Sequence, residues 1–387
     1  MRILLVGEYS RLHNSLKEGL LQHSHEVVLL GTGDGFKNFP CDISVKHSIF
    51  LNPALKIIAK AFDKFFNIQL IELEYYYKLK KIISGLKGFD VVQLINEQSL
   101  KTSPKHEIKL ISQLISQNKS LFLLSCGTDY SSIKFAINKK FKYSILTPYF
   151  EDPSLKSHYR FILKYASPPY KKLHEFLFKN IQGVIASDLD YHLPLKDKSK
   201  YLGLIPNPIN IDKISYKPIN IIGKVIIFHG INSMNYIKKG NRYFEEALHI
   251  IQKKYTDKVE IISTENLPYV DYIKAFDSCH ILLDQVYAYD QGYNALEAMA
   301  KGKVVFTGAE QEWLDYYKLD KDSVAINALP NTNDIVLKLE WLINNPDEIM
   351  KISKNARAFI ESEHHYITIA NKYMKHWQSP LQISQIH

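Results

Sequence analysis

The sequence has few cysteines and no long apolar run. Its three cysteines, Cys41, Cys126 and Cys279, stand far apart without metal-ligand spacing, so we expect reduced thiols. No stretch of the 387 residues approaches the roughly 18–20 consecutive apolar residues that a membrane-spanning helix needs. The apolar run within residues 1–7 is too short for the core of a signal peptide. We therefore expect a cytoplasmic protein.

The motifs of two further classes are also absent. The chain has no zinc-knuckle spacing and no aromatic RNA-binding motif, so its net charge of +9 does not indicate nucleic acid. The lysines are spread along the chain, which genome base composition can also produce, and a basic chain suits a phosphorylated ligand or an anionic membrane. The first apolar run lacks a following dinucleotide fingerprint, and the glycine-rich residues 31–35 come after the second run without opening a helix. This disfavours a nicotinamide-dependent oxidoreductase.

What the sequence does contain is a repeated alternation of short apolar runs and helical patterns. Strands of a first unit are predicted at residues 3–6, 26–30, 89–95, 120–125 and 183–187. Strands of a second unit are predicted at residues 224–229, 259–262, 280–283 and 303–306. Such short, fully apolar strands are typical of parallel sheets covered by helices on both faces. The expected fold class is therefore α/β.

A proline-containing stretch, residues 202–222, separates the two units. We predict an N-terminal Rossmann-like domain over residues 1–205 and a C-terminal one over residues 206–365. A final helical segment, residues 366–387, is expected to pack back on the N-terminal domain. Ligands of such sheets bind beyond the carboxyl ends of the strands, so the cleft between the domains is the expected site.

Residues 52–88 interrupt the first unit with a helical pattern that carries six lysines among Ile, Phe and Tyr. One interpretation is a solvated helical excursion packed on the domain. The other is a basic amphipathic surface that docks on anionic lipid. The sequence leaves both open.

Residues of the second unit have the chemistry to bind a sugar nucleotide. Gly292 opens a helix after an apolar run, and a glycine lets a phosphate approach its backbone closely. Lys238 and Lys239 follow the first strand of the same unit, where one of them can supply positive charge. Glu297 lies one turn into the helix, and a single carboxylate can accept two hydrogen bonds from a ribose diol.

Three segments resemble the nucleotide-binding half of the family-four retaining glycosyltransferases. They are Leu296-Glu-Ala-Met-Ala-Lys-Gly302, the turn Ile205-Pro-Asn-Pro-Ile-Asn210, and His229-Gly230 followed by Lys238-Lys-Gly240. The resemblance covers residues 200–380 and implies the GT-B fold, two Rossmann-like domains facing each other across a cleft. It assigns Glu297 to the ribose, and it expects donor contacts at Asn232, Tyr293, Asn294 and Ala295.

The sequence departs from the family pattern at two places. The position of the glutamate that contacts the transferred sugar is Tyr289, so Asp290, Asp284 or Gln285 is expected to take that role. The family's arginine after the first strand is missing, which leaves the phosphate charge to Lys238 and Lys239. The resemblance implies retention at the anomeric carbon, with Lys239 and Glu297 as catalytic residues and the departing phosphate taking the acceptor proton. We expect no cofactor beyond the nucleotide-sugar substrate.

The acceptor is expected on the first domain, where polar residues follow three predicted strands. Because the carboxyl ends of parallel strands meet at one edge, these residues should line one cleft. They are Glu8, Arg11, Asn14, Asn96, Glu97 and the segment Cys126–Asp129, with Glu8 and Asp129 foremost and Asp129 placed in the catalytic group. Asp188 and Asp190 are interpreted as a solvated surface pair, so no metal site is expected.

The resulting expectation is a glycosyltransferase that moves a sugar from a UDP- or GDP-sugar to a glycan or lipid-linked saccharide. Bacterial surface-polysaccharide assembly, at the inner face of the cell membrane, is the setting that the resemblance implies. The alternative is a non-catalytic nucleotide-sugar-binding scaffold of the same fold, which the tyrosine at position 289 and the missing arginine motivate.

Overall fold

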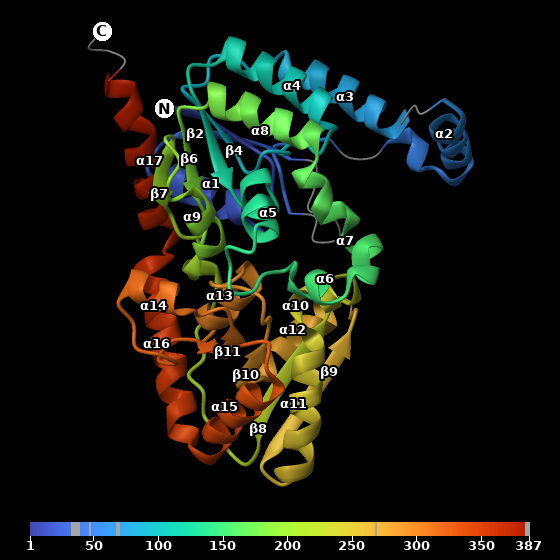
Figure 1. The fold of residues 1–387 in the computed structure, drawn as a ribbon. Helices are drawn as coiled ribbons and strands as arrows, with labels where there is room; N and C mark the ends of the chain where they lie inside the picture. Colours follow the sequence, from blue (N-terminus) through green and yellow to red (C-terminus); the bar gives the residue numbers. More distant parts are fainter. Residues whose placement is uncertain (32–38, 46–47, 67–69, 268, 384–387) are drawn as a thin grey trace.

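The computed structural model describes residues 1–31, 39–45, 48–66, 70–267 and 269–383. Figure 1 shows two α/β domains, one above the other, with helix α16 (Pro346–Glu363) along the second domain and helix α17 (Tyr366–Ile383) along the first. Most of the glycine-rich segment at residues 31–35 lies outside the described residues. The three cysteines are free, as expected.

The first domain is built on a parallel sheet. Its strands are β1 (Arg2–Val6), β2 (Glu26–Gly31), β3 (Ile43–Ser44), β4 (Val91–Leu94), β5 (Leu121–Ser125), β6 (Gly183–Ala186) and β7 (Tyr201–Leu204). In the described residues they lie in the order β3-β2-β1-β4-β5-β6-β7, all parallel. The order reverses between β1 and β4, which makes the edge beyond these two strands the expected ligand position.

Helices cover both faces of this sheet, as its fully apolar strands predicted (Figure 1). The helices of this domain are α1 (Leu12–Gln22), α2 (Pro53–Phe66), α3 (Leu70–Ile83), α4 (Pro104–Gln117), α5 (Tyr130–Ile137), α6 (Thr147–Glu151), α7 (Lys156–Leu163), α8 (Pro168–Asn180) and α9 (Leu189–Leu195). Along β1, Leu4 and Val6 belong to the apolar cluster that includes α4 and α8, whereas Ile3 and Leu5 belong to the one that includes α1. Strand β1 therefore buries both of its faces.

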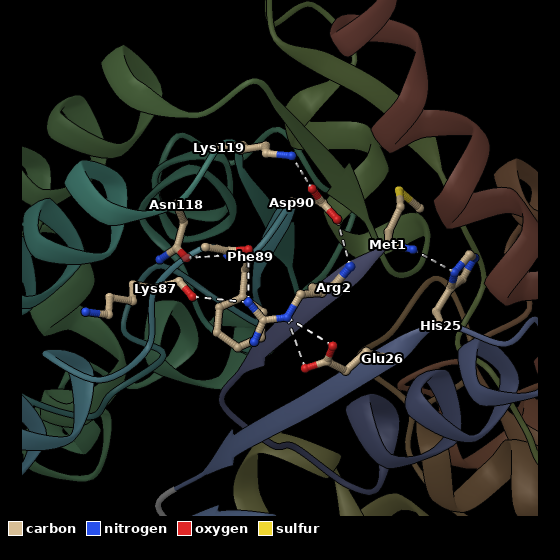
Figure 2. A network of polar contacts seen from close by, with 10 residues as sticks. Met1, Arg2, His25, Glu26, Lys87, Phe89, Asp90, Asn118 and Lys119 are labelled. Carbon is tan, nitrogen blue, oxygen red and sulfur yellow. Dashed lines mark hydrogen bonds and ion pairs between the residues drawn. The ribbon is translucent and has the colours of Figure 1, made fainter.

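Polar contacts tie together the amino ends of the strands, opposite to the edge where ligands bind. Figure 2 shows Arg2 at the centre, donating its backbone N–H to Asp90 at 2.8 Å and pairing its guanidinium with Glu26 at 3.0 Å. Lys119 pairs with the same Asp90 at 2.6 Å. This network links the starts of β1, β2, β4 and β5, so it stabilises the sheet while leaving the carboxyl edge to the site.

The second domain repeats the architecture on a smaller sheet. Its strands are β8 (Val225–Ile231), β9 (Val259–Glu265), β10 (Ile281–Leu283), β11 (Val304–Thr307) and β12 (Ile326–Asn327). Its helices are α10 (Tyr236–Lys239), α11 (Asn241–Lys254), α12 (Tyr269–Ser278), α13 (Tyr293–Ala300), α14 (Gln311–Tyr317), α15 (Thr332–Asn344) and α16 (Pro346–Glu363). The strand order β12-β11-β10-β8-β9 reverses between β8 and β10, so these two strand ends are the expected ligand position.

The last helix, α17 (Tyr366–Ile383), returns to the first domain and packs along α1 (Figure 1). A side-chain carbon at Gly19 of α1 would collide with the backbone of Tyr366, so glycine permits this close approach. Trp377 is fully buried and donates its indole N–H to Gln93 of β4 at 2.9 Å. Among the described residues, none of the helices has the length and apolar character to cross a membrane.

Candidate functional site

A cavity of about 230 Å³ lies between the carboxyl ends of the two sheets. The first domain supplies the loop after β5 with the start of α5, the segment before α6, and the start of α9. The second domain supplies residues from the loop that joins β10 to α13. Its polar lining residues are Thr128, Ser132, Ser144, Asp188, Asp190, Tyr191, Gln285, Tyr287, Asp290 and Gln291. A polar cavity between two such sheets suits a polyhydroxylated ligand.

The N-terminus of α13 opens at the edge of this cavity. Gly292 is the residue before the helix, and no side chain caps the first-turn amides. A side-chain carbon built at Gly292 would meet only the amide of Gln285, at 3.8 Å, so the space in front of the helix is open. Uncapped amides at a helix N-terminus attract phosphate groups. The sequence prediction for Gly292 therefore agrees with the local geometry.

Lys239 lies beside this helix terminus and pairs with Asp284 at 2.7 Å. The same carboxylate accepts hydrogen bonds from Asn294 at 3.2 Å and Thr307 at 3.3 Å, and it is 2% exposed as a side chain. Asp284 is thus engaged in holding the cation and Asn294, which removes it as a free sugar contact. Ala295, the other first-turn residue expected at the donor, is fully buried.

Lys238 points elsewhere. It lines a second hollow of about 390 Å³ together with His158, Ser233 and Glu265, and burial lowers the pKa of its ammonium group. Asn232, the other expected donor contact in this loop, accepts a hydrogen bond from Met234 and starts a short 3-10 turn. The structure therefore separates the two predicted phosphate lysines, and only Lys239 lies beside α13.

Tyr289 and Asp290 stand where a sugar contact was expected, but both are buried. The Tyr289 hydroxyl accepts a hydrogen bond from the backbone N–H of Lys142 at 2.7 Å, and its ring packs on Phe141 and Tyr143. The Asp290 carboxylate accepts the backbone N–H groups of Leu189 at 3.0 Å and Gln291 at 2.7 Å. Of the predicted sugar contacts, Gln285 and Asp290 line the cavity.

Tyr293, the first residue of α13, connects this helix to the first domain. Its hydroxyl donates to the carbonyl of Pro208 in the linker and accepts from the hydroxyl of Ser15 of α1 at 3.0 Å. Burial raises the pKa of Tyr293, and the negative charges of Glu297 and Glu8 add to the effect, so both carboxylates lie near the hydroxyl. The structure thus brings the predicted ribose carboxylate and a predicted acceptor residue to the same place.

The predicted acceptor residues after β1 meet at one edge of the sheet, yet their polar groups are engaged by residues of their own domain. Glu8 is 2% exposed and accepts two hydrogen bonds from Asn14, from the backbone at 2.9 Å and from the side chain at 2.7 Å. Arg11 pairs with Glu18 at 3.1 Å and keeps 31% of its side chain exposed. Arg11 is therefore more accessible to a ligand than Glu8.

The predicted acceptor residues after β4 and β5 are also buried and satisfied within their own domain. Asn96 donates to the carbonyls of Cys126 and Thr128, both at 2.9 Å, and so fixes the loop that lines the cavity. Glu97 contacts His174 at 2.5 Å, and burial raises the pKa of this carboxyl. Asp129 caps α5 by accepting the N–H of Ser132 at 2.7 Å. These side chains position loops, and it is their neighbours Gly127 and Thr128 that line the cavity.

The interpretation of Asp188 and Asp190 as a solvated surface pair was wrong. Both line the cavity, and Asp190 accepts the backbone N–H groups of Tyr289 at 3.1 Å and Asp290 at 3.2 Å. Burial raises the pKa of both carboxyls, and the neighbouring charge of Asp290 adds to the shift. The physical reason is that α9 starts directly after the buried strand β6, whose carboxyl end faces the cleft. A polar residue directly after an apolar strand was the available signal.

Two polar atoms in the cavity have no hydrogen-bond partner in the described part of the chain. They are one carboxylate oxygen of Asp188 and the side-chain oxygen of Gln291. Gln291 is only 2% exposed, so an unmet acceptor there favours a ligand hydroxyl. Within the described ranges, no group of three or more His, Cys, Asp or Glu side chains could hold a metal ion.

Comparison with known proteins matches residues 231–375 to the family described as glycosyl transferase-like. Among curated proteins, the NAD(P)+ glycerol-1-phosphate dehydrogenase of Picrophilus torridus is 29% identical over 123 residues. That alignment covers 31% of this chain, and the chain spans about a third of the dehydrogenase, 33% of its length.

Several solved structures share the fold over nearly the whole chain. HepE of Anabaena, solved with UDP and glucose, has a TM-score of 0.59 at 11% identity and covers 98% of this chain and 100% of its own. Sucrose-phosphate synthase of Thermosynechococcus elongatus has a TM-score of 0.59 at 12% identity, with coverage of 99% and 100%. A UDP-N-acetylglucosamine 2-epimerase of Listeria monocytogenes has a TM-score of 0.55 at 13% identity, with coverage of 98% and 96%. The chain therefore has the GT-B fold, and its second domain matches the glycosyl transferase-like family. The segment Leu296–Gly302 had predicted both.

Proposed function

We propose that the protein is a glycosyltransferase that moves a sugar from a nucleotide-sugar donor to a saccharide acceptor. One observation carries the proposal: the uncapped start of α13 lies beside Lys239, at the mouth of a polar cavity between the domains. The glycosyl transferase-like match over residues 231–375 supports it, since this match includes both elements. The UDP and UDP-sugar complexes of HepE favour a UDP-sugar over a GDP-sugar.

The proposed chemistry uses the residues of the second domain to stabilise the leaving group. As the bond between the anomeric carbon and the diphosphate breaks, negative charge grows on the phosphate oxygens. The first-turn amides of α13 and the Lys239 ammonium lie where they can stabilise that charge. Glu297 accepts the ribose hydroxyls in this scheme. We keep retention of configuration, with the phosphate taking the acceptor proton, as part of the proposal, and it involves no metal and no cofactor.

The acceptor in this proposal enters from the first domain. Thr128 and Asp188 line the cavity on that side, and the unmet oxygens of Asp188 and Gln291 suit sugar hydroxyls. A glycan or lipid-linked saccharide of a bacterial surface polysaccharide fits this arrangement, with the protein working at the cytoplasmic face of the membrane. Nucleic acid has no part in it.

A second candidate is a scaffold of the same fold that binds the nucleotide-sugar without turning it over. The buried Tyr289 motivates it, because its hydroxyl is engaged by Lys142 and offers the sugar no carboxylate.

Thermal shift with UDP-sugars, GDP-sugars and NAD, followed by assay of donor hydrolysis, separates the candidates. Stabilisation with slow hydrolysis supports the transferase. Stabilisation without hydrolysis or transfer to any lipid-linked acceptor supports the scaffold. A response to NAD alone contradicts both.

A further inference from the structure

Helix α2 exposes a cluster of large apolar side chains at the edge of the first domain. Ile57 is 71% exposed, Ile58 46%, Phe62 38% and Phe65 73%. Among the described helices, none of the others exposes more than two large apolar side chains. In Figure 1, α2 stands off from the body of the first domain, far from the second domain. An exposed cluster of this kind, on a helix that contributes little to the domain core, indicates an interaction surface.

The cluster occupies one side of the helix. At about 100° per residue, the four exposed residues fall within an arc of roughly 140°. Ala59 is 6% exposed and lies beyond one end of that arc, so this edge of α2 faces the protein. Lys56 and Lys60 are exposed and lie beyond the other end, next to Ile57. The exposed Asp63 projects between Ala59 and Lys56. The helix therefore presents apolar side chains with two lysines along one side.

We propose that α2 docks the protein on an anionic membrane surface. The exposed isoleucines and phenylalanines enter the boundary between headgroups and acyl chains, while Lys56 and Lys60 stay at the level of the anionic headgroups. The surface belongs to the domain that binds the acceptor in the proposed function. The inference rests on that function only for the idea that the acceptor is lipid-linked, because membrane binding itself requires neither donor nor acceptor.

A second copy of the chain is a poorer occupant. A helix of 14 residues is about 21 Å long and about 10 Å wide, so one face offers on the order of 200 Å². A stable dimer usually buries about 800 Å² from each partner. Membrane binding is not limited by the area of the helix face, because it requires only that a small apolar surface inserts next to positively charged side chains.

The test is flotation of the full-length protein with large unilamellar vesicles, without donor or acceptor. One set contains phosphatidylcholine with phosphatidylglycerol, and the other contains phosphatidylcholine alone. Two double variants alter the surface, Ile57→Ser with Phe65→Ser and Lys56→Glu with Lys60→Glu. The matched control is Ile222→Ser with Leu337→Ser, whose side chains in the second domain are 86% and 65% exposed. Melting temperature and mass in solution are measured for every protein.

We expect the wild type and the control to float with the anionic vesicles and to bind the neutral ones less. Each surface variant, folded with unchanged melting temperature, should bind anionic vesicles at least about tenfold more weakly. A wild type that does not bind anionic vesicles overturns the proposal, as do surface variants that bind like the wild type. A dimeric wild type that becomes monomeric in the Ile57→Ser and Phe65→Ser variant also overturns it. Donor hydrolysis, assayed without vesicles, reports on the proposed function separately.

Discussion

The side chains of Asp190 and Asp290 each accept a hydrogen bond from a backbone N–H group of the opposite domain. Asp190, in the first domain, accepts the N–H of Asp290 at 3.2 Å, and Asp290 accepts the N–H of Leu189 at 3.0 Å. Each carboxylate thus holds the backbone next to the other. This pair fixes the start of α9 against the loop before α13 and so sets the shape of the cavity between the domains.

The pair predicts a pH dependence of stability. Burial raises the pKa of both carboxyls to about 7, and for Asp190 the charge of Asp290 adds to it. Since an unfolded aspartate titrates near about 4, the folded state holds protons that the unfolded state releases between these values. The stabilising contribution is therefore complete below about pH 4 and is lost as the pH rises through about 7.

Asp190→Asn should make this loss smaller. The asparagine oxygen can still accept the same N–H groups, but it does not titrate. We expect the fall in melting temperature between about pH 4 and pH 8 to shrink by about 2 °C or more relative to the wild type. An identical pH profile in the variant would show that the pKa of Asp190 does not differ between the folded and unfolded states.

Lys239 and Lys238 should differ in their effect on donor binding. Replacing Lys239 by Met, together with Asp284→Asn so that no buried carboxylate is left unpaired, should weaken UDP-sugar binding about 10- to 100-fold. Lys238→Met is the matched control, because this lysine lines the other hollow and should leave affinity within about threefold. Calorimetric titration of each variant measures the two effects. The opposite ranking of the two variants would move the diphosphate to the second hollow.

Glu297 should contribute to ribose binding. Glu297→Ala is expected to weaken nucleotide binding by about 1–3 kcal/mol, the range for hydrogen bonds to a charged group. Glu297→Gln, which keeps one acceptor oxygen, should lose less. Titration with UDP and with 2′-deoxy-UDP measures the loss and tests whether the ribose hydroxyl is involved. Unchanged affinity in Glu297→Ala would remove this residue from the site.

Tyr289 should act as a structural residue. Tyr289→Phe leaves the N–H of Lys142 without its acceptor at a contact that joins the two domains. We expect a loss of about 1–3 kcal/mol in unfolding free energy, with donor affinity unchanged. Chemical denaturation followed by nucleotide titration checks both parts. A stable variant with weakened donor binding would indicate that the hydroxyl contacts the sugar.

The regular part of the fold was predictable because short apolar strands alternate with clearly periodic helices. The four strands predicted in the second domain correspond to β8, β9, β10 and β11, with ends within one or two residues except at β9, which extends further, whereas the two-residue strand β12 was not predicted. Between β5 and β7, however, the sequence analysis placed only one strand, whereas the structure has β6 and five α-helices. Aromatic residues and lysines alternate there without a clear period. The positions of those helices therefore depend on tertiary packing, which the sequence pattern does not reveal.

The site was predictable in its location and less so in the orientation of its side chains. The expectation that polar residues after parallel strands share one edge holds for Glu8, Asn96 and Asp129, but packing turned these side chains into their own loops. Lys238 and Lys239 are neighbours in sequence, yet one helical step of about 100° places Lys238 in the second hollow and Lys239 against Asp284. Asp188 was interpreted as a solvated surface residue although it obeys the same rule as the others.

The position of bound nucleotide tests the central claim most directly. A crystal structure of the protein with UDP should show the diphosphate within hydrogen-bond distance of the first-turn amides of α13 and the Lys239 ammonium. The ribose hydroxyls should contact Glu297. UDP bound in the hollow of Lys238 and Glu265 alone, with the start of α13 vacant, would contradict the account.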